Sequence, residues 1–363
     1  MATQRPLQIT VGPGAAELLQ REGWRGRDVS LLLGASGGPK WLILGHLDRV
    51  LAGEFLFEDR EVALEAVGSS VGSWRHACMA QDDPAAAYDR FEDIYVNQTY
   101  SEKPDAAEIS EASIGMLNHI LGEAGTRAII DHDLLHTHIV TARGRGLAGS
   151  SGGVALVAGM AGGALGNAAS RRLLAGSFQR VIFNSRNAPA LPYDDFGTTY
   201  VPMTPESVFP ALHASGSIPF VLTGERDIDN APPGHYWDGG IIDYHFDLAD
   251  FAPRVTESEG LLFYPHFRND ITPGWFDKFL PWRRRAPRGV DHLVMISPSK
   301  AFIESLPHGK IPDRSDFTRM TTEDRLSYWR ECIERSKELA EDFRERVGSS
   351  NPLENVSILG ESR

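Results

Sequence analysis

Short apolar runs alternate with helical patterns through the first half of the chain, and this alternation limits the fold more than any other feature. The runs over 28–33 and 61–67 are rich in Val, Leu and Ala, which is typical of buried strands. Each run is followed by a segment with helical patterning, over 39–52 and 70–80. Strand, turn and helix in this order predict βαβ units, and therefore an α/β fold whose largely parallel sheet is covered on both faces.

Later segments extend this pattern. We expect further strands over 135–141, 180–183, 260–264 and 293–296. Residues 321–346 form a polar helical pattern with an apolar stripe, and we expect that helix to dock on the body of the protein.

No stretch has the composition of a linker, so we expect one domain over residues 1–363. Its core would span about 28–250. Residues 84–130 would form a helical insertion, either a lid or plain scaffold, and residues 250–363 a C-terminal extension.

Charge and cysteine content exclude several classes of protein. Acidic residues outnumber basic ones, 49 to 36, and a net charge of −13 argues against a general nucleic-acid binder, which needs a basic face. Cys78 and Cys332 cannot form a disulfide framework, and the N-terminus lacks a signal-peptide pattern, so we expect a cytoplasmic protein. The uncharged, Gly/Ala-rich residues 147–169 favour a buried helix or loop beside the active site over a transmembrane helix.

The motif G-x-S-x-G occurs three times, at 34–38, 68–72 and 149–153. Such a turn can place a serine hydroxyl above a sheet, at the N-terminus of a helix. The second copy follows an apolar strand and precedes a helical segment, so Ser70 is the candidate nucleophile and Gly68 and Gly72 are the small residues of its turn. Ser36 has a similar context and stays an alternative, whereas no strand directly precedes Ser151.

Two other glycine-rich segments supply further candidate residues for the site. Gly37 and Gly38 begin a predicted helix, where backbone N–H groups can hold a phosphate or an oxyanion. A P-loop is excluded because Lys40 is followed by Trp41 instead of Ser or Thr. In the second half, Asp238 precedes two glycines, and such a turn lets the carboxylate approach another group closely.

Taken in order, SGGPK (36–40), GSSVG (68–72), ASGSIP (214–219) and DGG (238–240) resemble the motifs of the patatin-like phospholipase family. The resemblance covers about residues 28–248. It implies a three-layer α/β/α sandwich with a mainly parallel central sheet. It also implies a serine acyl-ester hydrolase of the lipase, phospholipase or esterase type, with no metal and no organic cofactor.

Carried over to this chain, the resemblance implies a catalytic dyad of Ser70 and Asp238. Asp238 would take the hydroxyl proton directly, and the N–H groups of Gly37 and Gly38 would form the oxyanion hole. The substrate would be a lipid or another acyl ester.

The glycine-rich loop departs from the family pattern. Ala35 and Ser36 occupy its first two positions, and Pro39 has no N–H to donate. The bulky Trp41 stands where the family has a small residue and would alter the shape of the acyl pocket. A phospholipid substrate therefore does not follow from the resemblance.

Other interpretations stay open. A Ser–His–Asp triad could use a late histidine, His266, His292 or His308. A third reading is a catalytically silent lipid or acyl-chain binder with the same fold. The cluster of His132, His136 and His138 with Asp131 and Asp133 fits no common zinc spacing, so we expect no metal site there.

Residues 274–288 combine aromatic side chains with a run of arginines, namely Trp275, Phe276, Phe279, Trp282, Arg283, Arg284 and Arg285. This combination suits a peripheral contact with a lipid surface. The alternative is a loop with buried aromatic rings whose arginines pair with carboxylates, since the net charge opposes attraction to an anionic membrane.

Overall fold

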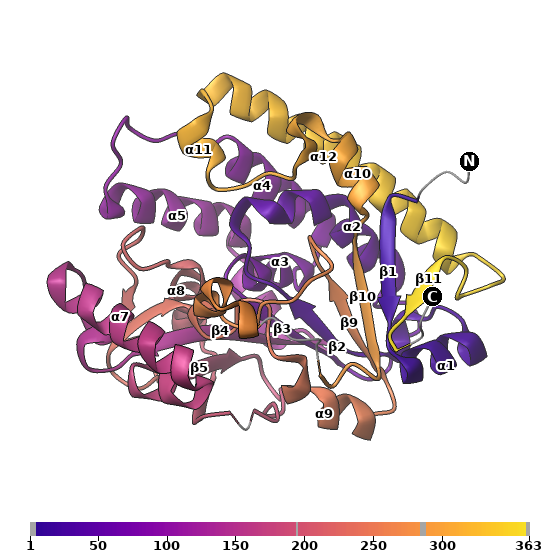
Figure 1. Ribbon diagram of the computed structural model, residues 1–363, viewed down its shortest axis with the longest axis horizontal. Coiled ribbons are helices and arrows are strands. Elements are labelled where there is room, and N and C mark those ends of the chain that lie inside the picture. Colours follow the sequence, from indigo (N-terminus) through magenta and orange to yellow (C-terminus); the bar gives the residue numbers. More distant parts are fainter. Residues whose placement is uncertain (1–4, 194, 284–287, 361–363) are drawn as a thin grey trace.

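The computed structural model describes residues 5–193, 195–283 and 288–360. A mixed, mainly parallel sheet crosses the molecule with helices on both faces, which confirms the predicted three-layer α/β/α sandwich (Figure 1). The strands in order across the sheet are β11 (Val356–Ile358), β1 (Leu7–Val11), β10 (Leu293–Pro298), β9 (Leu261–Pro265), β2 (Val29–Gly34), β3 (Leu64–Ser69), β4 (Leu135–Gly144), β5 (Phe178–Asn184) and β6 (Thr198–Pro202).

The centre of the sheet is parallel and its margins are mixed. β10, β9, β2, β3 and β4 pair in parallel, whereas β1 pairs antiparallel with β10 and β5 antiparallel with β4. A short strand, β8 (His235–Asp238), also pairs antiparallel with β4 and carries the two-residue β7 (Glu225–Arg226) on its other side. The end of β8 is thereby held beside the parallel centre.

Helices cover both faces of this sheet. In Figure 1, α2, α4, α5 and α12 lie above it and α1 and α9 below it. The α-helices are α1 (Pro13–Glu22), α2 (Gly45–Val50), α3 (Val71–Met79), α4 (Pro84–Val96), α5 (Ala106–Leu121), α6 (Gly125–Asp131), α7 (Gly153–Ala169), α8 (Pro205–Gly216), α9 (Ala252–Glu257), α10 (Lys300–Ser305), α11 (Asp316–Arg319) and α12 (Thr322–Val347). No helix in the described ranges is both long enough and apolar enough to cross a bilayer.

The expected helix over 39–52 is a composite. It begins as the 3₁₀ helix η2 (Gly38–Leu44), continues as α2 and ends in the single π turn η3 (Leu51–Phe55). α12 docks on the body as predicted, because Trp329, Ile333 and Phe343 of its apolar stripe are buried.

The prediction for residues 147–169 was only half right. These residues do contain a helix, α7, which Leu156 and Met160 anchor in a small apolar cluster. The opposite face of α7 is open to solvent, so the helix is not the buried element that its Gly/Ala-rich composition suggested.

Candidate active site

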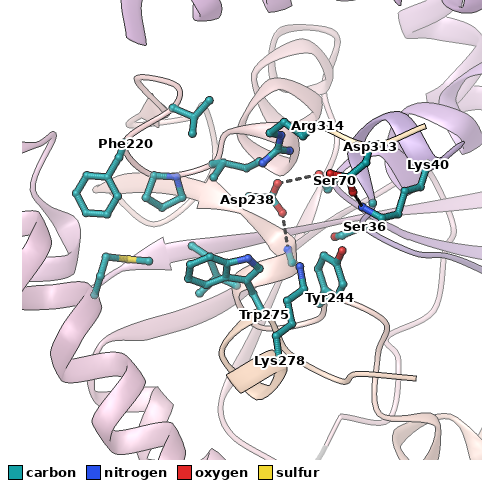
Figure 2. A pocket seen from close by; sticks show the side chains of 18 residues that line it. Ser36, Lys40, Ser70, Phe220, Asp238, Tyr244, Trp275, Lys278, Asp313 and Arg314 are labelled. Atoms are coloured by element: carbon teal, nitrogen blue, oxygen red, sulfur yellow. Dashed lines mark hydrogen bonds and ion pairs between the residues drawn. The ribbon is translucent and has the colours of Figure 1, made fainter. Parts of the chain in front are cut away.

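A pocket of about 560 Å³ opens where β2, β3 and β8 end (Figure 2). Parallel α/β sheets commonly bind ligands beyond the carboxyl ends of their strands. One wall is apolar and is formed by Met160, Ile218, Pro219, Phe220, Val221, Ile241 and Trp275. The polar lining comes from Ser36, Lys40, Ser70, Asp238, Tyr244, Lys278, Asp313 and Arg314. Segments far apart in the sequence therefore meet at one cavity.

Ser70 occupies a strained turn between β3 and α3. Its backbone has φ 56° and ψ −130°, a conformation that a non-glycine residue rarely adopts. The flanking glycines are required by close packing: a Cβ on Gly72 would lie 1.9 Å from the carbonyl oxygen of Gly34, and one on Gly68 would lie 2.6 Å from the backbone of Ser73. The turn holds the Ser70 hydroxyl in the pocket, the geometry that the G-x-S-x-G motif predicted.

The Ser70 hydroxyl meets the carboxylate of Asp238. Ser70 Oγ donates a hydrogen bond of 2.7 Å to Asp238 Oδ2, and Gly240 N–H donates one of 2.7 Å to Oδ1 (Figure 2). A Cβ on Gly240 would lie 2.5 Å from Ser36 Oγ and 2.9 Å from Asp238 Oδ1, so a larger residue would displace these side chains. The two residues predicted to act together are thus in direct contact, although 168 positions separate them in the chain.

The surroundings of Asp238 raise the pKa of its carboxyl and so make it a better proton acceptor. Burial raises the pKa of its carboxyl to about 6, while the hydrogen bonds from Ser70 and Gly240 and the charges of Arg314 and Lys278 limit the rise. The carboxyl is therefore ionised at neutral pH yet more basic than an exposed aspartate. This is the range that suits a general base.

The ASGSIP segment holds both members of the pair in place. Ser215 Oγ accepts a 3.0 Å hydrogen bond from Ser70 N–H and donates one of 2.7 Å to the carbonyl oxygen of Val140. Two residues on, the carbonyl oxygen of Ser217 accepts a 2.8 Å hydrogen bond from Asp238 N–H. The resemblance marked this segment without assigning a role to its serines, and the structure places them as supports for the two backbones.

Gly37 and Gly38 line the pocket at the start of η2. The first N–H groups of a helix have no acceptor within that helix, so they are available to a ligand. Gly38 has φ 55°, the left-handed region that glycine adopts without strain. The predicted oxyanion loop therefore lines the same pocket as Ser70.

The two other G-x-S-x-G serines have different surroundings. Ser36 also lines the pocket, but its Oγ donates to Ser69 Oγ over 3.0 Å instead of to a carboxylate. Ser151 is exposed in the turn before α7 and does not line the pocket. Of the three, Ser70 alone has a base as its hydrogen-bond partner within the described residues.

Three cations border the pocket. Lys40 forms an ion pair with Asp313, and Lys278 Nζ lies 3.5 Å from the centre of the Tyr244 ring. Burial, together with the charges of Lys40 and Arg314, lowers the pKa of Lys278 to about 8. Sequence reasoning missed Asp313 and Arg314, which follow β10 and lie outside the span of the resemblance, and no local pattern marks them.

The remaining candidates lie elsewhere. His266, His292 and His308, all within the described ranges, do not line the pocket. His136 and His138 both contact the carboxylate of Glu65, at 2.8 and 2.7 Å. Across residues 5–193, 195–283 and 288–360, no group of three or more His, Cys, Asp or Glu side chains could hold a metal ion.

Trp41 does not alter the pocket. Its ring is buried behind the loop and stacks on Phe91 with a centroid distance of 4.0 Å. The expectation drawn from its bulk was wrong because the side chain points away from the cavity into the core. The helical segment 84–130 also contributes no lining residue.

Residues 274–288 have a mixed arrangement. Trp275 and Lys278 line the pocket and Phe276 is buried, whereas Phe279 and Trp282 are exposed. Arg284 and Arg285 lie outside the described residues, as does the side chain of Arg283.

Comparisons with models of protein families, with curated proteins and with solved structures found no match.

Proposed function

We propose that this protein is a serine acyl-ester hydrolase of the patatin-like type that uses a Ser70–Asp238 dyad. One observation carries the proposal: the Ser70 hydroxyl, on a strained strand-to-helix turn, donates directly to a buried carboxylate within a pocket. A nucleophile in hydrogen-bond contact with its base is the arrangement that covalent catalysis requires.

The reaction has two steps. Ser70 Oγ attacks the acyl carbon while Asp238 Oδ2 accepts the hydroxyl proton. The tetrahedral intermediate collapses, the alcohol leaves with that proton, and an acyl-serine ester remains. Water then attacks the ester, Asp238 again takes a proton, and the carboxylic acid is released as Ser70 regains its hydrogen.

The glycine-rich loop supports the charged intermediate. The N–H groups of Gly37 and Gly38 would hold the oxyanion at the start of η2, where the helix dipole also favours negative charge. Loss of one such donor typically costs about 3 kcal/mol of transition-state stabilisation.

The pocket lining suggests what kind of ester enters. The apolar wall formed with Met160, Phe220 and Trp275 suits an acyl chain, and the cations on the other side suit a polar or anionic head. The contact between Ser70 and Asp238, with no histidine in the lining, favours the dyad over a Ser–His–Asp triad.

Labelling with a fluorophosphonate tests the proposal, because this probe reacts with an activated serine hydroxyl. We expect peptide mass spectrometry to locate the label on Ser70, and Ser70→Ala to lose both the label and the hydrolysis of a soluble p-nitrophenyl ester. Ser36→Ala is the matched control and should keep the label.

Two outcomes contradict the proposal. A label on Ser36 or Ser151 would mean that a different turn carries the nucleophile. Absence of label, together with retention of a fatty acid at equilibrium and no ester turnover, would identify a silent acyl-chain binder.

A further inference from the structure

Helix α7 exposes its apolar side. Val154, Val157 and Leu165 are 86%, 55% and 75% exposed. Ala158 and Ala161 complete the same face, at the three- and four-residue spacing of one helix side. A helix at a protein surface normally turns a polar face to water.

The buried side of α7 carries the polar group. Asn167 is buried and its Nδ2 donates a 2.7 Å hydrogen bond to Asp277, whereas residues 153–166 hold no charged or amide side chain. The exposed face of α7 is therefore apolar like its buried face, instead of polar as in a usual amphipathic helix. Contiguous apolar surface of this kind marks a contact site on a folded protein.

The segments packed along α7 enlarge this surface. The 3₁₀ helices η4 (Gly146–Gly149) and η5 (Arg171–Gly176) both pack against α7. Each contributes one exposed leucine, Leu147 and Leu173. We call the exposed side chains of α7, η4 and η5 the α7 surface.

The sequence segment that contains the α7 surface has a charge opposite in sign to that of the chain as a whole. Residues 134–193 contain no Asp or Glu, although the net charge of the protein is −13. They contain the arginines Arg143, Arg145, Arg171, Arg172, Arg180 and Arg186. Arg145 and Arg172 are exposed beside η4 and in η5, so an apolar surface is flanked by cations.

Helix α7 also contributes to the pocket, from its buried side. Met160 of α7 belongs to the pocket wall, and the half-exposed Phe220 stands in the same wall (Figure 2). The helix that carries the α7 surface therefore also forms part of the apolar wall of the pocket.

We propose that the α7 surface docks the protein onto an anionic lipid surface. Its apolar side chains would enter the boundary between headgroups and acyl chains, and Arg145 and Arg172 would contact the anionic headgroups. The docking stands on the α7 surface alone; its use in delivering an acyl ester to Ser70 rests on the function proposed above.

Vesicle flotation tests the docking. The full chain is mixed with vesicles of phosphatidylglycerol and phosphatidylcholine in equal parts, and with vesicles of phosphatidylcholine alone. We expect the wild type to float with the mixed vesicles and more weakly with the neutral ones. Val157→Asp combined with Leu165→Asp should lower the bound fraction at least about tenfold, since each charge opposes insertion into a hydrocarbon boundary.

Matched variants separate the contribution of the apolar side chains to binding from that of the arginines. Val62 is 78% exposed in the loop that precedes β3, at the end of that strand opposite Ser70, so Val62→Asp should leave flotation unchanged. Arg145→Gln combined with Arg172→Gln should weaken binding to the mixed vesicles and remove its salt dependence. All variants should keep their thermal melting temperature and their turnover of a soluble ester.

The outcomes also separate the docking from the proposed function. Ser70→Ala should float like the wild type; flotation without any ester turnover would uphold the docking and overturn the hydrolase proposal. Equal flotation of the double aspartate variant, or no flotation of the wild type with either vesicle, would overturn the docking. A wild-type dimer in light scattering that the double variant converts to monomers, with no flotation, would assign the α7 surface to a second copy of the chain.

Discussion

Two buried aspartates on one turn have opposite surroundings. Asp238 accepts hydrogen bonds from two uncharged donors, Ser70 Oγ and Gly240 N–H. Asp243 is also buried, but it accepts from Arg180 at 2.7 and 2.9 Å and from Arg171 at 3.0 Å. The first carboxylate is left free to exchange a proton and the second is held between two guanidinium groups.

The ion pairs of Asp243 hold the turn that carries Asp238. Asp243 N–H donates a 2.8 Å hydrogen bond to the carbonyl oxygen of Gly239, and Arg171 donates one of 3.0 Å to the carbonyl oxygen of Ile242. Asp195 completes the cluster by accepting from both arginines. One carboxylate therefore fixes the backbone, and the other is available for chemistry because no cation pairs with it directly.

Replacing the free carboxylate should have the largest effect. We expect Asp238→Asn to lower kcat/KM for a soluble p-nitrophenyl ester by about 10³-fold or more, equal to about 4 kcal/mol, because the amide cannot accept the Ser70 proton. The melting temperature should not fall, since the variant removes a buried charge whose ionisation opposes folding. Near-normal turnover by the folded variant would show that Asp238 is not the base that activates Ser70.

Replacing the paired carboxylate should act on stability instead. We expect Asp243→Asn to lower the free energy of unfolding by about 3–5 kcal/mol in a urea titration, because it leaves the guanidinium groups of Arg180 and Arg171 with Asp195 as the remaining counter-ion. Asp270→Asn is the control, because its ion pair with Arg268 is exposed and should contribute less than about 1 kcal/mol. A stable Asp243→Asn protein with a large loss of turnover would mean that Asp243 serves catalysis directly.

The smallest expected effect concerns the pH profile. Asp238 must be ionised to accept a proton, so kcat/KM should fall as pH drops through about 6, the pKa to which burial raises this carboxyl. Arg314→Gln removes a positive charge that favours the carboxylate, and the acid limb should move upward by less than about one pH unit.

Arg319 is exposed, as Arg314 is, and lies five residues further along the chain. Its replacement in Arg319→Gln should leave the acid limb unchanged. A downward shift of the acid limb in Arg314→Gln would show that Arg314 does not favour the ionised form of Asp238.

Much of the architecture could be predicted because strand, turn and helix are neighbours in the chain. Val29–Gly34 and Leu64–Ser69 lie within three residues of the predicted strands. β1 and β11 were missed, since they are short and take their places only by pairing with each other and with β10. The composite helix from Gly38 to Phe55 was predicted as one helix because 3₁₀, α and π turns share similar residue patterns.

For the candidate site, local motifs together with the resemblance of their order to a known family selected Ser70, Asp238, Gly37 and Gly38. In the GSSVG and DGG turns, a Cβ on Gly68, Gly72 or Gly239 would lie within 2.6 Å of backbone atoms, and such constraints are visible over a few residues. Trp41 shows the limit of this reasoning, because the direction of a side chain depends on what packs behind it.

Contacts between distant segments required the folded chain. The 2.7 Å contact between Ser70 and Asp238, the raised pKa of that carboxyl and the arrival of Arg314 at the pocket all depend on burial and on pairing across the sheet. The exposure of the apolar face of α7 likewise depends on the folded chain. Composition showed that residues 147–169 were uncharged, but only packing determined which face of the helix would meet water, because burial is a property of neighbours in space.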